Sequence, residues 1–369
     1  MTGLNKNQKL TYATSGVDTE AGEKAVALMK ESILKTKRPE VLGDFGGFAG
    51  LFDASKLKNY KNPILATSTD GVGTKIDIAK RMNLHDTIGI DLVAMVVDDL
   101  VVCGAEPLFM TDYIAVGKVE PEKISAIVTG VAKGCQLAGC ALLGGETAEH
   151  PGLMAEDDYD IAGAGTGVVD ADKLLGPDRV LEGDIAIAIA SSGLHSNGFS
   201  LARHVAFNLA GLNVDSYVAE FGKTLGEKFL TPTTIYAKFI LDFINVSEVH
   251  SISHITGGGI AANVARVLPS HLALEIDRGS WKPNSVFNWL IRTGNINLFD
   301  AEKTFNMGIG MLLIVPSGQA SEAIRFFSTL GLPAWECGIV RKRAENELGD
   351  SPAKGGSGGA VFLRNNHRI

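Results

Sequence analysis

Three observations predict that this sequence forms an α/β protein of two domains, of the α+β kind with mixed sheets. A chain of 369 residues with 45% hydrophobic content can bury a large core and is long enough for two domains. Apolar runs of strand length alternate with amphipathic stretches of helical length. Outside the last residues, the glycines gather at the ends of apolar runs, so several tight turns are expected to converge.

The composition argues against several classes of protein. No apolar run reaches about 18 residues, because Asp98 and Asp99 interrupt LVAMVVDDLVV, and the polar beginning MTGLNKNQK does not fit a signal peptide. A net charge of −8 without a Lys/Arg-rich block argues against nucleic acid as a partner. The four cysteines form no CxxC pair, so disulfides and structural zinc are not expected. We therefore expect a cytoplasmic protein that does not enter a membrane.

An acid, a flexible turn, a hydroxyl and a cation stand together in the stretch STDGVGTK, residues 68–75. The combination suits a nucleotide, because a carboxylate can hold a divalent metal and glycines let the backbone approach a phosphate. It is not a P-loop, since G-x-x-x-x-G-K-[ST] occurs nowhere in the chain. A solvated glycine-rich turn fits the same residues. The candidates are Asp70 for metal and Gly71, Gly73, Thr74 and Lys75 for phosphate.

The first half begins with a polar arm over residues 1–17. A helix is expected over 18–36, where apolar residues recur at helical spacing, and Lys30 on this helix also fits a solvated surface lysine. Residues 43–52, GDFGGFAGLF, are too rich in glycine for a helix. They predict a hairpin or loop that packs its phenylalanines.

A second helix, expected over 85–104, is apolar nearly all round and should therefore be buried. Asp99 follows three large apolar side chains at helical spacing, which places its carboxylate on the apolar stripe. A buried carboxylate needs a hydrogen bond, an ion pair or a metal, so both a structural and a metal-binding role stay open. Asp91 and Asp98 on a neighbouring face could serve the same centre.

The first half continues with strands over 107–116, within CALLGGETAEHPG (residues 140–152) and over 160–169, and with a helix over 121–139. The second of these strands ends in a Gly-Gly-Glu turn, from which Glu146 projects after Gly145. The polar stretch DADKLLGPDRVLEGD that follows marks a domain boundary at about residue 175. The expected domains are therefore 18–174 and 175–342.

The second half begins with a buried strand from residue 184 and the turn SSGLHSNG, ahead of a helix that starts near Phe199. Donors and acceptors ahead of a helix N-terminus favour an anion. His195 in this turn is a candidate acid, base or electrophile, and a structural histidine fits equally well. TGGGIAA matches only the looser dinucleotide pattern G-x-G-x-x-A. Residues 343–369, with AKGGSGGA, predict a flexible tail.

A series of motifs runs in order from about Tyr12 to Val340: TYATSGVD, STDGVGTK, HDTIGIDLVAM, GAEPLF, LLGGETAEHPG, SSGLHSNGFSLAR, PTTIY, HITGGG and FNMGIGM. Together they resemble the phosphoribosylformylglycinamidine cyclo-ligase family, the aminoimidazole ribonucleotide synthetases of purine biosynthesis. GGETAE followed by HPG, and SSGxHSNG followed by HITGGG, look like this family rather than selenophosphate synthetase, thiamine-phosphate kinase or a hydrogenase maturation factor.

The resemblance implies an ATP-dependent ring closure. The formyl oxygen of formylglycinamidine ribonucleotide is phosphorylated, a nitrogen attacks the activated carbon, and aminoimidazole ribonucleotide, ADP and phosphate result. The family fold has two α/β domains, and the first pairs with its copy in a homodimer through a shared barrel-like sheet. The active site lies in the cleft between the domains.

The resemblance also assigns roles to residues. Mg²⁺ would be held by carboxylates, ATP by a lysine and by glycine-rich turns, and the substrate by the SSGLHSNG turn. His195 would polarise the formyl oxygen or shuttle a proton. The residues carried over are Asp70, Asp99 and Glu146 for Mg²⁺, Lys30, Gly71, Gly73, Thr74, Lys75 and Gly145 for ATP, and His195, Lys75 and Asn197 for catalysis.

Four positions depart from the family pattern. Asp98 stands where Asn is usual, Leu194 replaces Pro, Asp44 replaces Gly and Ser15 replaces Ala. An extra carboxylate at 98 could alter metal affinity, and Leu194 could loosen the loop that places His195. A small-molecule kinase of the same superfamily and a non-catalytic nucleotide-binding relative stay open as alternatives.

Overall fold

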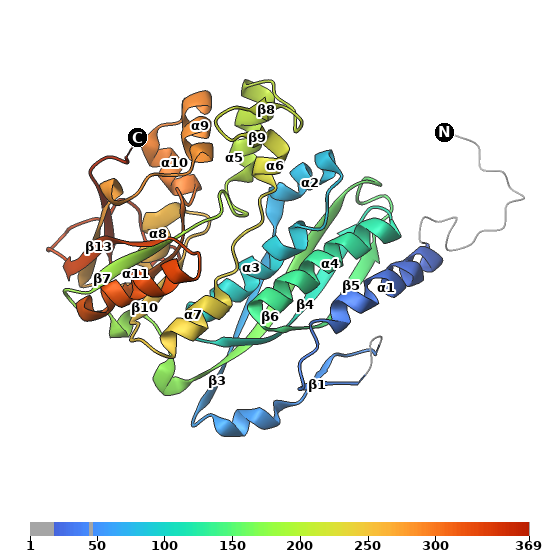
Figure 1. Ribbon diagram of the computed structural model, residues 1–369, viewed down its shortest axis with the longest axis horizontal. Coiled ribbons are helices and arrows are strands. Elements are labelled where there is room, and N and C mark those ends of the chain that lie inside the picture. The colour runs from blue at the N-terminus through green and yellow to red at the C-terminus, as the bar shows by residue number, and fades with distance from the viewer. Residues whose placement is uncertain (1–17, 44–46, 369) are drawn as a thin grey trace, which may run out of the picture.

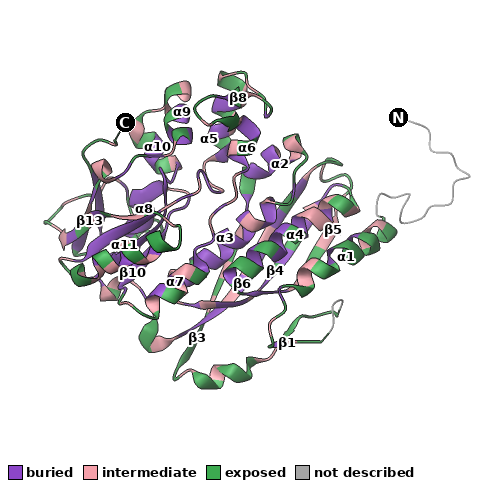
Figure 2. Cartoon of the chain, in the orientation of Figure 1, coloured by how far each residue is buried: buried purple, intermediate pink, exposed green. Residues whose placement is uncertain are grey.

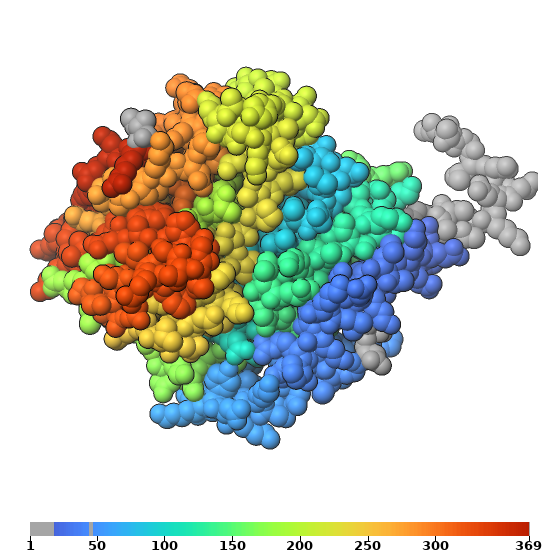
Figure 3. Space-filling model, in the orientation of Figure 1, coloured from blue at the N-terminus to red at the C-terminus, as the bar shows by residue number. Residues whose placement is uncertain are grey.

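The chain folds into two α/β halves, each with its own sheet and helices, that lie side by side (Figures 1 and 3). The computed structural model describes residues 18–43 and 47–368. One sheet has four strands in the order β3-β6-β4-β5, and the other has six in the order β10-β12-β7-β13-β11-β14. The mixed-sheet fold predicted from the sequence is confirmed. The polar arm over 1–17, with Ser15, and Asp44 lie outside the described residues.

The first half contains the four-stranded sheet and the helices on one of its faces (Figure 1). Its elements are α1 (Thr19–Leu34), β1 (Val41–Leu42), β2 (Leu51–Phe52), β3 (Pro63–Gly71), α2 (Ile76–Met82), α3 (Ile88–Val101), β4 (Glu106–Val116), α4 (Pro121–Ala138), β5 (Ala141–Glu149) and β6 (Tyr159–Asp170).

The second half contains the six-stranded sheet. Its elements are β7 (Ile185–Ala190), α5 (Phe199–Arg203), β8 (Tyr217–Val218), β9 (Lys223–Thr224), α6 (Leu225–Phe229), α7 (Ala237–Ile244), β10 (Ser251–His254), α8 (Gly259–Ala265), β11 (Leu272–Asp277), α9 (Ser285–Gly294), α10 (Leu298–Thr304), β12 (Ile309–Val315), α11 (Ala320–Thr329), β13 (Ala334–Lys342) and β14 (Ala360–Arg364). The chain passes from one sheet to the other between residues 170 and 185.

Local sequence explains where the helices of the first half begin and end. Asp18 caps α1, because its side chain accepts a hydrogen bond from the backbone N–H of Ala21. Pro121 occupies the first turn of α4, where its missing N–H costs nothing, and Gly139 ends that helix in the left-handed conformation.

Helix α3 is the element that joins the halves. It is buried along almost its whole length, as Figure 2 shows, and it packs on the four-stranded sheet and against α4 and α7. The close approach of α3 to the sheet depends on small residues in β6, since a Cβ at Gly165 would lie 2.7 Å from Val96. The prediction of a buried helix here is confirmed.

The other face of the four-stranded sheet is largely open. Strand β3 exposes Leu65, Thr67 and Thr69, and strand β4 exposes Thr111 and Tyr113 on the same face. Leu65 is 59% exposed and Tyr113 43% exposed, which is unusual for large side chains in the middle of strands. The helices therefore cover only one face of this sheet.

The prediction of a flexible tail over 343–369 is wrong for the described part of it. Residues 360–364 form β14, which pairs in parallel with β11 and buries Val361 and Leu363. Glu347 and Asp350 anchor the connection, through ion pairs to Arg341 and a hydrogen bond from the Leu363 N–H. The short run AVFLR was too brief to reveal an apolar period.

The predicted hairpin is present, because β1, just before the glycine-rich segment 43–52, pairs antiparallel with β2 at its end, but the phenylalanines do not all pack. Phe48 is fully exposed, while Phe52 lies 5.1 Å from the Phe109 ring, centroid to centroid. Phe45 lies outside the described residues. In the part of the chain that the structure describes, no helix is both long and apolar enough to cross a membrane.

Candidate active site between the two domains

Two acids of α3 hold the second half of the chain in place. Asp91 accepts hydrogen bonds from the backbone N–H and hydroxyl of Thr233, at 2.8 and 2.6 Å, and from the Lys75 ammonium at 2.8 Å. The Asp98 carboxylate accepts the backbone N–H of Tyr236 at 3.0 Å. The extended segment 231–236 thus uses two carboxylates as its backbone acceptors.

Lys75 is not placed to meet a phosphate, which corrects the expectation from STDGVGTK. It has no exposed surface, and its ammonium bonds Asp91 and the carbonyl oxygen of Thr231 at 2.7 Å. Burial lowers the pKa of Lys75, and Asp91 opposes that shift. The turn becomes the start of α2, so its last residue points into the interface between the domains.

Asp99 is also placed differently from the expectation. Its side chain is 43% exposed, while Asp91 and Asp98 of the same helix are fully buried. Near the C-terminal end of α3 the apolar stripe no longer faces the core. Asp99, the last residue of the stripe, therefore faces the interface with the second domain. There the Asp99 carboxylate accepts a hydrogen bond from Nδ1 of His254, at 2.9 Å. The pair is an interdomain contact.

Several ionisable groups gather around this pair. Burial raises the pKa of Asp98 to about 7, and one of its oxygens is buried without a hydrogen bond. Burial also raises the pKa of Asp70, and the Asp99 charge adds to that shift, whereas His254 and Lys354 oppose it. The charge of His254 therefore acts on carboxylates of both β3 and α3.

His195 lies in the same region with an unusual backbone. Its φ is +59°, in the left-handed region, and its side chain is buried. Nε2 accepts the backbone N–H of Ser192 at 3.2 Å, so the proton of the neutral ring is on Nδ1, which is buried and has no partner among the described residues. Burial lowers the pKa of His195 well below its usual value, and the nearby charge of His254 lowers it further.

Asn197 joins the two glycine-containing turns of the second domain. Its side-chain oxygen accepts the backbone N–H of Gly257 at 2.9 Å, and its amide nitrogen lies 4.0 Å from the Met95 sulfur on α3. We call Asp70, Asp98, Asp99, His195, Asn197 and His254 the interdomain cluster. It combines carboxylates from the first domain with imidazoles and an amide from the second.

The rest of the STDGVGTK turn borders the interface. Gly73 has a positive φ of 70° and is exposed, and the Thr74 hydroxyl lies 3.2 Å from that of Ser200. Gly71 donates its N–H to the Asp70 carboxylate at 2.7 Å.

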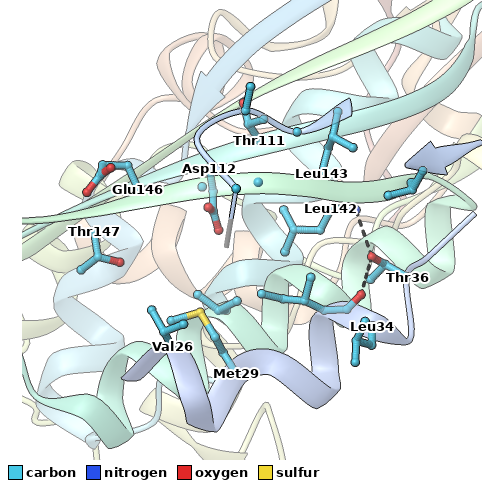
Figure 4. A pocket seen from close by; sticks show the side chains of 18 of the residues that line it. Val26, Met29, Leu34, Thr36, Thr111, Asp112, Leu142, Leu143, Glu146 and Thr147 are labelled. Atoms are coloured by element: carbon cyan, nitrogen blue, oxygen red, sulfur yellow. Dashed lines mark hydrogen bonds between the residues drawn. The ribbon is translucent and has the colours of Figure 1, made fainter. Parts of the chain in front are cut away.

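Gly145 and Glu146 lie elsewhere, at a cavity on the β5 edge of the sheet (Figure 4). This edge cavity has a volume of about 650 Å³ and lies between α1, the 47–51 segment and strands β4 and β5. Apolar side chains of α1, among them Val26 and Met29, form one wall, and Asp112 reaches it from β4. Lys30 is exposed on α1 and does not line the cavity.

The three expected metal ligands do not come together in this chain. Asp70 shares a cross-strand row with Gly163, Asp112 and Gly145, whereas Glu146 belongs to the next row. Neighbouring rows point to opposite faces, and Figure 4 shows Glu146 and Asp112 on opposite sides of β5 and β4. Three strand spacings, about 14 Å, also separate β3 from β5. Among the described residues, no group of three His, Cys, Asp or Glu could hold a metal ion.

Two residues of the region were given no role from the sequence. His254 ends the buried strand β10 just before TGGG, at a place where a buried histidine needs a partner. Asp112 is an acid at an inward position of β4; burial raises its pKa to about 7, and one oxygen has no hydrogen bond. In both cases the signal was a polar residue at a position that the strand period predicts to be inside.

Family models match both halves of the chain. The N-terminal domain of AIR synthase related proteins matches residues 53–169, and the C-terminal domain matches residues 182–351. A phosphoribosylformylglycinamidine cyclo-ligase from Geotalea uraniireducens is 47% identical over 90% of this chain and 96% of its own length. One from Brevibacillus brevis is 50% identical over 89% of this chain and 95% of its own length. The chain belongs to this cyclo-ligase family.

Solved structures outside the cyclo-ligase family share its fold. Thiamine-monophosphate kinase from Stenotrophomonas maltophilia aligns with a TM-score of 0.62 at 18% identity, over 91% of this chain and 95% of its own. HypE from E. coli aligns with a TM-score of 0.63 at 20% identity, over 87% and 91%. These similarities concern the fold.

Proposed function

We propose that the interdomain cluster closes the imidazole ring of aminoimidazole ribonucleotide from formylglycinamidine ribonucleotide, at the expense of ATP, in cytoplasmic purine biosynthesis. The observation that carries the proposal is the meeting of His195, with a buried and unused N–H, and the Asp99–His254 pair at one interface. Family membership at 47–50% identity supports the same reaction.

His195 would polarise the formyl oxygen. Its ring is neutral, because burial disfavours the imidazolium, and its Nδ1–H is the donor left over after Nε2 has accepted the Ser192 N–H. An unpaired buried donor costs about 1–3 kcal/mol, so an oxygen of the substrate that accepts this proton is bound with little competition. Donation to that oxygen makes the formyl carbon more electrophilic.

Asn197 would orient the substrate and His254 would place a donor or acceptor beside it. Asn197 uses its oxygen on Gly257, so its amide N–H groups are available for an oxygen of the substrate. His254 is held by Asp99 through Nδ1, and its Nε2 is buried without a partner in the described chain. Phosphoryl transfer depends mainly on such positioning and charge compensation.

Mg²⁺ would be held by Asp70 and Asp99, together with phosphate oxygens. Their charges influence one another, and Mg²⁺ is commonly bound by one or two carboxylates plus phosphates rather than by a cage of protein ligands. When bound, the ion would neutralise charge on the transferred phosphoryl group. Glu146 lies too far from these two carboxylates within one chain to join them.

ATP would use the edge cavity and the Gly71–Thr74 turn. The cavity lies within the usual 300–1,000 Å³ of ligand pockets, and its apolar α1 wall and polar β5 end suit a base and its sugar. Gly145 lines it, and Lys30 is exposed on the same helix. The turn beside Asp70 offers an exposed hydroxyl and a flexible backbone to phosphates.

A homodimer formed through the four-stranded sheet would cover its open face. That face exposes Leu65 and Tyr113 in mid-strand, where a partner surface would remove them from water. The separation of the edge cavity from the interdomain cluster within one chain also favours an assembly in which two copies cooperate.

The reaction is tested with purified protein, ATP and Mg²⁺, with and without formylglycinamidine ribonucleotide, by measuring ADP and aminoimidazole ribonucleotide in the same samples. Substrate-dependent ADP release matched one-for-one by the imidazole product is the expected result. ADP release with a phosphorylated product but no imidazole would indicate a kinase. No product from folded protein, at any Mg²⁺ concentration, would reduce the proposal to a nucleotide-binding protein.

A further inference from the structure

Helix α10, with the residue after it, packs against two turns of the second domain: the SSGLHSNG turn, which carries His195 and Asn197, and the TGGG turn, which follows His254. A Cβ added to Gly198, directly after Asn197, would lie 2.6 Å from the Phe305 ring. A Cβ added to Gly259, in the TGGG turn, would lie 1.6 Å from the carbonyl oxygen of Glu302. Only glycine permits such approach. The position of α10 therefore sets the position of both turns.

Buried ionic contacts hold α10 at Glu302. The Glu302 side chain is 4% exposed and receives two parallel hydrogen bonds from Arg278, at 2.6 and 2.7 Å. His367 adds a third contact, 3.1 Å from Nε2 to the same carboxylate. Burial alone would raise the pKa of Glu302, but these hydrogen bonds outweigh it and lower the pKa, so the carboxylate is ionised.

His367 also supports the His195 turn by a second route. Its ring packs edge-on against Trp281, with centroids 4.7 Å apart, and the Trp281 indole donates to the carbonyl oxygen of Met307 at 2.9 Å. The neighbouring Asn306 donates to the carbonyl oxygen of Gly193 at 2.9 Å and accepts the Ser191 hydroxyl at 3.1 Å. Two series of contacts thus connect His367 with the SSGLHSNG turn, in which His195 has a left-handed backbone.

We propose that His367 is a positioning residue for the active site, through which the segment 352–368 fixes the SSGLHSNG turn, which carries His195 and Asn197, and the TGGG turn that follows His254. The segment lies beyond the residues that the family models match, and its anchor is β14. A turn held in a left-handed backbone at His195 depends on such external support. The effect on turnover rests on the proposed function, but the effect on the turns does not.

The test compares His367→Ala with two other variants. His367→Gln keeps an N–H for Glu302. Asn366→Ala is the control, because it removes the exposed side chain of the residue just before His367. We expect His367→Ala to lower kcat by roughly tenfold with KM changed by less than about twofold, since misplaced groups impair the transition state more than binding. His367→Gln should restore most of kcat. Amides of residues 191–198 and 256–260 should exchange hydrogen faster in His367→Ala alone.

Turnover and exchange in His367→Ala that equal those of Asn366→Ala would overturn the proposal. If His367→Ala does not fold, the test rests on His367→Gln. A kcat roughly tenfold below wild type in that variant, together with wild-type hydrogen exchange in the two turns, would then overturn the proposal as well. A wild-type protein that forms no aminoimidazole ribonucleotide would refute the proposed function instead. In that case faster exchange in the two turns would still support His367 as their anchor.

Discussion

At the scale of single residues, surroundings separate side chains that look equivalent in the sequence. Lys75 was expected at a phosphate, yet it is fully buried and neutralises Asp91. Asp98 and Asp99 are neighbours on α3, but one is buried and the other faces His254. His195 was singled out as a catalytic candidate, and the structure buries it near His254; its catalytic role stays a prediction. Its neutral state follows from burial, which no motif encodes.

We expect His195→Ala to reduce kcat by at least about a hundredfold while the protein stays folded, because the substrate loses its buried donor. Steady-state kinetics and a thermal melt measure the two effects. The control is His204→Ala, which removes an exposed histidine six residues after the end of the SSGLHSNG turn and should be near wild type. Equal kinetics of the two variants would make His195 a structural residue.

The buried carboxylate at 98 should make stability depend on pH. Its folded pKa of about 7 lies above the unfolded one, so the folded state binds more protons between pH 4 and 7 and loses stability as pH rises. Asp98→Asn keeps an acceptor for the Tyr236 N–H and removes this loss, up to about 4 kcal/mol. Urea unfolding in metal-free buffer should show the variant's advantage growing from pH 5 to pH 8. An advantage that does not change with pH would contradict the raised pKa.

At the scale of secondary structure, long periodic segments were predicted well and short ones were not. The sequence indicated α1, α3, α4 and the main strands, because their apolar residues recur over several turns or alternations. Strand β14 has five residues and follows a glycine-rich loop, so its pairing with β11 became visible only in the sheet. Long-range pairing, not local preference, orders this segment.

Leu363→Ala should therefore lower the free energy of unfolding by about 2–4 kcal/mol, since Leu363 is 7% exposed in β14. Leu348→Ala, in the same part of the chain but at an 80% exposed side chain, should change it by no more than about 0.5 kcal/mol. Denaturant unfolding of both variants makes the comparison. Equal, small effects would return residues 343–368 to the flexible tail expected from the sequence.

At the scale of the whole molecule, two features depend on how the halves are arranged. The interdomain cluster exists because α3 carries Asp98 to Tyr236, just before α7, and Asp99 to His254 at the end of β10. The open face of the four-stranded sheet, by contrast, is only partly covered in a single chain, by the segment 51–60. We expect a second copy to cover it.

Leu65→Glu would place a charge on that face, on the edge strand β3. We expect a homodimeric wild type and a largely monomeric variant, measured by size-exclusion chromatography with light scattering, because a buried unpaired carboxylate is strongly unfavourable at an interface. Leu181→Glu, at a 60% exposed leucine in the second half, should leave the mass unchanged. A dimeric Leu65→Glu variant would place any interface elsewhere.

The sequence by itself determined the family and the mixed α/β class and singled out some of the polar residues of the interdomain cluster, but not His254, because motifs and periods are local and need no partner. Only the tertiary structure decided what those residues do. It buried Lys75 against Asp91, paired Asp99 with His254, and set Glu146 on the opposite face of the sheet from Asp70. The physical reason is that burial, strand order and contacts between distant segments set charge and orientation, and these arise only when the chain is folded.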